Sequence, residues 1–399
     1  MFDDLDISAL MIDRRAEAAK RFKQLRASSP IHFCEKSPYG AYWSVTRRQG
    51  IVDVERNHKL FSSANNVIIG NVPEEFDDTQ AFATADPPIH TIERQAVVPG
   101  TGLARASELR AYTQQLVENL LEKAPRGEVF DWSASVSAEI TRHMAAKLFG
   151  FDAAERQQLE LWYQILVTTP GPNAAVTTWD ERATELANYR ARLESLWHQR
   201  AEAKEGDHHD VIAGLVSNTA TNSMIDNPMR FLGTVSLIAG ANEAAHVALD
   251  ACIVAFNRYP QEWEKLCAHP ELTTQAAAEV VRWQSPILHM RRTATQETEL
   301  GGQNIAAGDK VVLWYYSGNR DEDWFDAADT LRIDRDNVNQ HVGFGAGIHR
   351  CLGRHIARME LEVVLQTLQA QGLPELVDSP QAIASNFSSA YKQVLVQHR

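Results

Sequence analysis

The sequence predicts a mainly α-helical fold with small β-sheets. From about residue 105 to 265, apolar residues recur at helical spacing with few breaks. After Pro286 the pattern changes to short alternating stretches separated by glycines, which is typical of short strands. No linker rich in Pro, Gly or Ser divides the 399 residues. We therefore expect one large domain over residues 1–399, although chains of this length often form two or three domains.

The N-terminal part mixes helices and strands. The patterns predict an amphipathic helix over 14–27, a strand over 41–46 and a helix over 52–58. Residues 64–88 combine Asn, Gly, Asp and Pro with scattered apolar side chains, which is typical of a long loop. The helical part that follows is expected to contain helices over 107–123, 132–149, 153–167, 180–203, 208–217 and 227–257.

The predicted helix over 227–257 is apolar on several faces, so we expect it to be buried. It contains Gly233 and Gly240, although glycine in a helix interior costs about 1 kcal/mol relative to alanine. Close packing or a local deformation would explain them. Beyond it, we expect short strands over 291–315, an irregular segment, a helix over 352–370 and a terminal hairpin over 386–397.

Composition excludes several classes of function. Lys and Arg number 39 against 52 Asp and Glu, a net charge of −13, which argues against general binding to nucleic-acid phosphates. Four cysteines without metal-finger spacing cannot form a disulfide framework. The N-terminus lacks the pattern of a signal peptide, and no apolar run of about 18 residues could cross a membrane. We expect a cytoplasmic protein.

One cysteine has an unusual setting. Cys351 follows a glycine-rich loop and precedes a predicted helix, in the segment FGAGIHRCLG. The unpaired N–H groups at a helix N-terminus favour a thiolate, which can act as a nucleophile or a metal ligand. The other thiols, Cys34, Cys252 and Cys267, are expected to be inert core residues.

The segment from Phe344 to Gly353 resembles, at every fixed position, the haem-binding signature FxxGxxxCxG of the cytochrome P450 superfamily. The resemblance implies the P450 fold, with haem (heme b) buried between the long central helix and the Cys351 loop. It implies that Cys351 ligates the iron and that Phe344, His349 and Gly353 belong to the cofactor-binding loop.

Two further motifs are similar to those of the same family. Glu279 and Arg282 are spaced to meet on one helix face. The resemblance implies that they form a buried structural group with Arg335. His90 and Arg94 also share a helix face and are suited to the haem propionates, to which the resemblance adds Arg292 and His349.

The segment LIAGANEAAH matches the oxygen-binding part of the family's central helix, with one departure. The best alignment places Gly240 and Ala241 in the small positions, Glu243 as the acid, and Ala244 where Thr is expected. A one-residue shift would instead put Glu243 in the Thr position. In both alignments the hydroxyl is missing, so protons must come from a water chain, from Glu243 directly or from a hydroxyl on the substrate.

The resemblance also locates the substrate pocket. Three segments resemble the bacterial alkane-hydroxylase and sterol side-chain branches of the family: EVVRWQSPILHMRRTAT, GDKVVLWYYSGNRDE and SNF near residue 386. This resemblance implies a hydrophobic aliphatic or terpenoid substrate. The predicted pocket residues are mainly apolar: Val67, Ile68, Ile69, Phe82, Leu166, Val167, Leu237, Ala241, Ile287, Leu288 and Phe387.

The implied activity is hydroxylation of this small molecule with O2. Nothing in the chain resembles a flavin or iron–sulfur domain, so electrons are expected from a ferredoxin and an NAD(P)H-dependent ferredoxin reductase. Arg350 and Arg354 could dock an acidic ferredoxin or serve the propionates. Two alternatives remain: a peroxide-driven haem oxidase that uses Glu243 as acid–base, and a haem-binding or sensor protein without oxygen activation.

Overall fold

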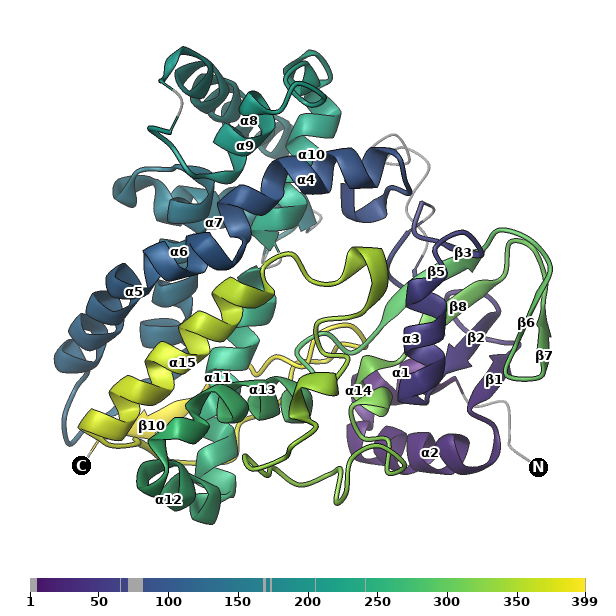
Figure 1. Cartoon of the computed structure of the whole chain (residues 1–399). Coiled ribbons are helices and arrows are strands. Elements are labelled where there is room, and N and C mark those ends of the chain that lie inside the picture. Colours follow the sequence, from purple (N-terminus) through teal and green to yellow (C-terminus); the bar gives the residue numbers. More distant parts are fainter. Residues whose placement is uncertain are drawn as a thin grey trace.

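The computed structural model describes residues 6–64, 66–70, 82–167, 170–172, 174–204, 206–240 and 242–398. A helical body occupies one side of the molecule, and a sheet with the N-terminal helices occupies the other (Figure 1). The helices are α1 (Ile7–Asp13), α2 (Arg15–Ser28), α3 (Arg48–Arg56), α4 (Ile89–Thr101), α5 (Leu103–Lys123), α6 (Ala138–Phe149), α7 (Arg156–Val167), α8 (Trp179–Glu202), α9 (Val211–Ser217), α10 (Pro228–Gly240), α11 (Asn242–Arg258), α12 (Pro260–Ala268), α13 (Thr273–Gln284), α14 (Tyr315–Gly318) and α15 (Arg354–Gln371).

The strands of the described residues form three small sheets. The largest has the order β1-β2-β8-β5-β3, the second has the order β4-β10-β9, and β6 pairs with β7. Their bounds are β1 (Ile31–Cys34), β2 (Tyr42–Val45), β3 (Phe61–Ser62), β4 (Val129–Asp131), β5 (Met290–Ala294), β6 (Thr298–Leu300), β7 (Gln303–Ile305), β8 (Lys310–Leu313), β9 (Glu375–Leu376) and β10 (Leu395–Gln397). The predicted fold class, mainly α with small sheets, is confirmed.

The main hydrophobic core lies among α5, α6, α11, α13 and α15. From Ala245 to Phe256, α11 is buried at nearly every position, as expected for a helix that is apolar all round. Helix ends follow sequence signals: Thr178 and Glu181 form a capping box at the start of α8. Gly150 ends α6 with a φ of 74°, in the left-handed region that favours glycine.

Two predicted elements differ from the structure. The segment predicted as one helix over 227–257 comprises α10 and α11, and residue 241 between them lies outside the described residues. The terminal hairpin lies at 381–392, where Ile383 N–H donates to Ala390 O at 3.0 Å. Residues 395–397 form β10 instead, because β4 and β9 offer it partners on both sides.

The described helices include none that combines the length and the hydropathy needed to cross a bilayer.

Candidate active site

Cys351 lies between the short turn Gly347–His349 and the start of α15. Its N–H donates to Phe344 O at 2.8 Å, which closes the loop. Burial raises the pKa of the Cys351 thiol, while the N–H groups of Gly353 and Arg354 and the Arg354 guanidinium lower it. A coordinated metal ion overcomes such a burial penalty, because a thiol that binds a metal is deprotonated.

Two glycines of this loop lie in different surroundings. Gly347 has a φ of 62°, and a Cβ atom there would come within 3.0 Å of the backbone carbonyl of Glu55. Backbone cannot move aside as a flexible side chain can, so only glycine fits. At Gly353 a Cβ would meet no described protein atom within 4 Å, so space beside Cys351 is open there.

Two histidines meet beside the Cys351 loop. The rings of His90, from α4, and His349 have centroids 4.1 Å apart. Both ring nitrogens of His90 and Nε2 of His349 are buried without a hydrogen-bond partner among the described residues. Burial lowers the pKa of His90 to about 4 and that of His349 to about 2. Each neutral ring can donate one hydrogen bond, so the pair fits a group that brings carboxylates, such as haem.

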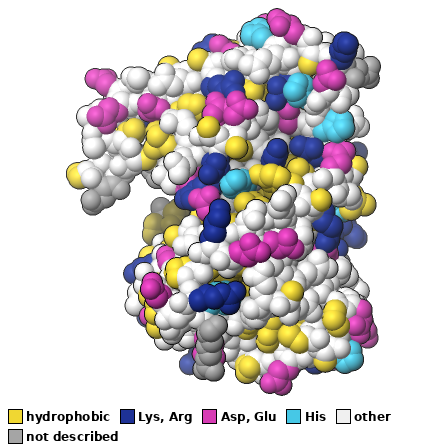
Figure 2. Space-filling view, turned by 90° about the vertical axis from the view of Figure 1, so that its left-hand side faces the viewer, with side chains coloured by type: hydrophobic (Ala, Val, Ile, Leu, Met, Phe, Trp, Pro, Cys, Tyr) yellow, Lys and Arg dark blue, Asp and Glu magenta, His cyan; other side chains and the backbone are white. Residues whose placement is uncertain are grey.

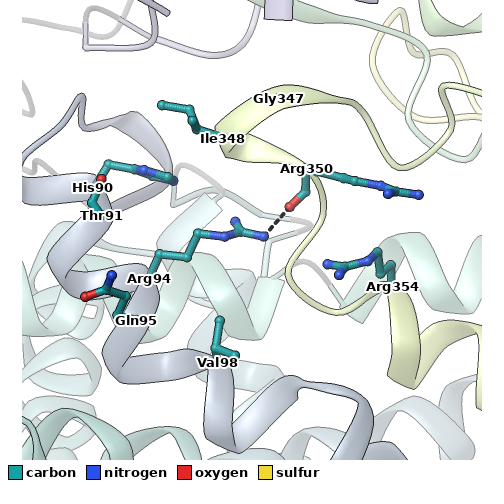
Figure 3. Close-up of a pocket in the computed structure, with 9 residues that line it drawn as sticks. All are labelled: His90, Thr91, Arg94, Gln95, Val98, Gly347, Ile348, Arg350 and Arg354. Atoms are coloured by element: carbon teal, nitrogen blue, oxygen red, sulfur yellow. Dashed lines mark hydrogen bonds between the residues drawn. The ribbon is translucent and has the colours of Figure 1, made fainter. Parts of the chain in front are cut away.

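A groove of about 490 Å³ separates α4 from this loop. In Figure 3, Arg94 extends across it and donates to Arg350 O, at 2.6 Å. The face in Figure 2 is hollowed between the upper helices and the rest of the molecule, and basic, histidine and apolar side chains gather there. The lining residues are His90, Thr91, Arg94, Gln95, Val98, Gly347, Ile348, Arg350 and Arg354.

Glu55 connects the loop to the sheet and was missed by the sequence reasoning. Its buried carboxylate accepts hydrogen bonds from the Tyr315 hydroxyl and the Ala346 N–H, and it pairs with Arg292 at 3.3 Å. Burial raises the pKa of Glu55, and Arg292 lowers it. One signal was available, because Glu55 follows the buried Ile51 by one helical turn and so lies on the apolar face of α3.

The three predicted structural residues lie together. Arg282 Nε is 2.6 Å from one Glu279 oxygen, and Arg335 Nε is 3.0 Å from the other. All three side chains are buried, and Arg282 also donates to the carbonyl groups of Asn319 and Ala328. The group therefore joins α13 to the irregular segment that leads to the Cys351 loop.

On the central helices, Glu243 is exposed in the first turn of α11 and Ala244 is half-buried. Gly240 ends α10, whereas Ala241 lies outside the described residues. The Tyr163 phenol, from α7, lies near Glu243, which adds to the effect of burial in raising the pKa of Tyr163. The sequence reasoning missed Tyr163, because nothing local predicts which residue of α7 faces α10.

The predicted pocket residues divide into groups. Three of them are half-buried, namely Val67, Ile287 and Phe387, and Ile68 is exposed. The ring of Phe82 stacks on that of His90, with their centroids 6.1 Å apart. Ile69 and Leu288 are buried in the hydrophobic cluster that includes Trp314, and their place in the pocket stays a prediction. The side chains of Leu166, Val167 and Leu237 lie outside the described residues.

Comparison with known proteins gives one consistent result. Residues 249–370 match the Cytochrome P450 family. The chain is 34% identical over 388 residues to linalool 8-monooxygenase of Pseudomonas putida, covering 94% of each protein. It is 30% identical to the methyl-branched lipid omega-hydroxylase of Mycobacterium tuberculosis, covering 98% of this chain and 93% of the relative.

The solved structures agree. Cytochrome P450-153 from Novosphingobium aromaticivorans superposes with a TM-score of 0.87 at 32% identity, over 98% of both chains. The Mycobacterium marinum cytochrome P450 in complex with pseudoionone gives a TM-score of 0.86 at 27% identity, over 100% of this chain and 99% of that one. The chain is therefore an oxidoreductase of the monooxygenase type, with haem iron as the implied cofactor. It belongs to the cytochrome P450 family.

Proposed function

We propose that the chain hydroxylates a hydrophobic aliphatic or terpenoid molecule, according to RH + O2 + 2 electrons + 2 H⁺ → ROH + H2O. The observation that carries the proposal is the position of His90 and His349 beside the Cys351 loop, with three ring nitrogens buried and without a partner among the described residues. Cys351 would ligate the haem iron, and His90, Arg94, Arg292 and His349 would contact the propionates. When bound, a thiolate-ligated haem favours cleavage of the O–O bond.

The remaining residues position and protect this centre. The group of Glu279, Arg282 and Arg335 supports the approach to the Cys351 loop, and Glu55 holds the Ala346 N–H. Glu243, in the first turn of α11, would hold a proton for the reaction. Apolar side chains at Val67, Phe82, Ile287 and Phe387 would exclude water and contact the substrate.

The proposed substrate class rests on two relatives that are named for different substrates. The proteins at 34% and 30% identity are named for linalool, a terpenoid, and for methyl-branched lipids. Both names describe branched, largely apolar molecules, which suits the apolar side chains around the site. A terpenoid alcohol or a branched aliphatic chain is therefore the substrate class we propose.

We propose that electrons arrive from a ferredoxin and its NAD(P)H-dependent reductase. Arg94, Arg350 and Arg354 line the groove beside Cys351 and give this face positive charge, although the net charge is −13. Charge complementarity would steer an acidic ferredoxin to it, and added salt would slow the encounter. A peroxide-driven reaction is the second candidate, because Ala244 lacks the hydroxyl and Glu243 is exposed.

The first test is spectroscopic. The reduced protein with carbon monoxide should show the Soret shift typical of a thiolate ligand, and Cys351→Ala should abolish it. Cys267→Ala, at an exposed thiol, is the matched control. A thiolate-type band that survives in Cys351→Ala would contradict the iron-ligand assignment.

The second test compares oxidants. Terpenoids, branched fatty acids, alkanes and sterols are screened for the spectral change that accompanies displacement of iron-bound water. The best binder is then incubated either with ferredoxin, reductase and NAD(P)H or with hydrogen peroxide alone. Product formed only with the redox partners supports the monooxygenase, and product formed only with peroxide supports the second candidate.

A further inference from the structure

Gly240 and Tyr163 are in tight contact where α7 lies on α10. A Cβ atom at position 240 would lie 2.7 Å from Cζ and 2.9 Å from the hydroxyl oxygen of Tyr163. These separations are shorter than real Cβ contacts, so the tyrosine ring occupies the space that only glycine leaves free. The adjacent Trp162 donates instead to Glu185 of α8, at 3.0 Å, whereas the half-buried Tyr163 contacts α10.

The phenol of Tyr163 lies near the Glu243 carboxylate, across the end of α10 and the start of α11. Burial, followed by the nearby Glu243, raises the pKa of Tyr163 to about 12, so the phenol keeps its proton at neutral pH. The next polar residue along the helix, His246, faces elsewhere: it bonds to Ser133 at 2.7 Å and lies 3.5 Å from Asp250.

We propose that Tyr163 is the positioning residue that compensates for the missing hydroxyl at position 244, by holding the Glu243 carboxyl group over the oxygen-binding side of the haem. This inference rests on the proposed monooxygenase function. The glycine at 240 is then required less for oxygen access than for seating the tyrosine ring. The proton-donating group of this chain is an acid oriented by a phenol from α7, rather than an acid and an alcohol on one helix.

The proposal predicts how electrons are distributed between two products. Productive turnover consumes O2, two electrons and two protons to give ROH and water from RH. When protons are not delivered to the position that leads to O–O cleavage, O2, two electrons and two protons give hydrogen peroxide instead, and RH is unchanged. A misplaced Glu243 should therefore shift electrons from product to peroxide without changing substrate affinity.

The main experiment uses the haem-loaded protein and the best substrate found by spectral screening. Tyr163→Phe keeps the ring but removes the O–H, and product formed per NAD(P)H should fall about threefold to tenfold, the range expected for loss of one hydrogen bond. Hydrogen peroxide should rise to account for the lost electrons. Gly240→Ala should give the same defect with the tyrosine present, because its Cβ displaces the ring. Tyr112→Phe, which removes a phenol bonded to His143 at 2.7 Å, is the matched control.

A readout without turnover separates positioning from a general structural effect. The C–O stretching frequency of the reduced carbon monoxide complex reports polar groups on the distal side. It should shift in Tyr163→Phe and in Glu243→Gln, and stay unchanged in Tyr112→Phe. In the Glu243→Gln background, Tyr163→Phe should cause no further loss of coupling.

Two results would overturn the proposal. One is full coupling in Tyr163→Phe, and the other is an equal loss of coupling in the parent and Glu243→Gln backgrounds. Failure of the proposed function would look different, since the parent protein itself would then lack the thiolate-type carbon monoxide band or any substrate turnover.

Discussion

The imidazole rings of His90 and His349 lie with their centroids 4.1 Å apart, yet neither ring bonds to the other. One comes from α4 and the other from the turn before Cys351. Both ring nitrogens of His90 and Nε2 of His349 are buried without a partner among the described residues, which is costly unless a further group satisfies them. We therefore expect a carboxylate-bearing cofactor bound beside this pair to stabilise the protein.

Replacing His90 by Phe should accelerate haem loss. The ring stack with Phe82 is kept, but the hydrogen bond to a propionate is lost. Such a bond to a charged group contributes about 1.5–3 kcal/mol, which corresponds to roughly tenfold to hundredfold faster dissociation. Haem transfer to apomyoglobin measures this rate, and His269→Asn, at an exposed site, is the control. An unchanged rate would contradict the propionate role.

Replacing Glu55 by Ala should destabilise the fold by about 3–5 kcal/mol, because Arg292 would lose the buried carboxylate that pairs with it within the protein. The same change should loosen the Cys351 loop, since the Ala346 N–H also loses its acceptor. Urea denaturation monitored by far-UV circular dichroism gives the free energy of unfolding. Asp53→Asn, on the exposed side of the same helix, should cost less than about 0.5 kcal/mol. An equal loss in the free energy of unfolding for the two variants would contradict a stabilising role for the buried contacts of Glu55.

Glu360 should make stability fall as pH rises. Its carboxyl oxygens on α15 are buried without a described partner, and burial raises its pKa to about 8. Between about pH 4.5 and 8 the unfolded chain releases this proton and the folded chain keeps it. This residue therefore lowers the free energy of unfolding by up to about 1.4 kcal/mol per pH unit in that window.

Glu360→Gln should flatten this slope, as measured by urea denaturation at several pH values. Glu362→Gln is the control, because that carboxylate pairs with Arg110 at the surface of the same helix. A slope in Glu360→Gln that matches the parent would show that Glu360 is ionised in the folded protein.

His289 should act in the opposite direction. Its Nε2 accepts from Ile69 N–H at 3.1 Å, and its Nδ1 donates to Asn386 O at 2.9 Å. Burial lowers the pKa of His289 to about 4. As pH falls from about 6.5 to 4, the unfolded chain binds the proton and the folded chain does not, so this residue makes stability decrease toward acid pH.

His289→Phe should remove that acid sensitivity and release the two segments it joins. Hydrogen exchange followed by mass spectrometry should show faster exchange at 66–70 and in the hairpin over 381–392. Peptides from α12 serve as the internal control. Protection of 66–70 that is unchanged in the variant would contradict the role of His289 as a junction.

Local sequence signals predicted the parts of the site that are themselves local. The loop from Phe344 to Gly353 and the Glu279–Arg282 pair are short motifs whose geometry follows from spacing on a loop or a helix. The helical body was predicted for the same reason, because helical periodicity is contained within each segment.

Contacts between distant segments could not be predicted in this way. The partners of Glu55 come from elements far along the chain, and each looks like an ordinary surface or core residue alone. Tyr163 needs the packing of α7 on α10 to become meaningful. The burial of Ile69 and Leu288 in the cluster that includes Trp314 was not predicted either, because that cluster gathers residues far apart in the sequence.

The order β4-β10-β9 has a kinetic consequence. The middle strand of this sheet reaches its neighbour β4 across a long stretch of chain, as in the bond from Val394 N–H to Asp131, 263 residues away. Closing so long a loop is entropically unfavourable before the intervening helices have collapsed. We expect β4 to stay without its partner during early folding. This small sheet should therefore form after the helical body has folded, and it should not direct the folding of that body.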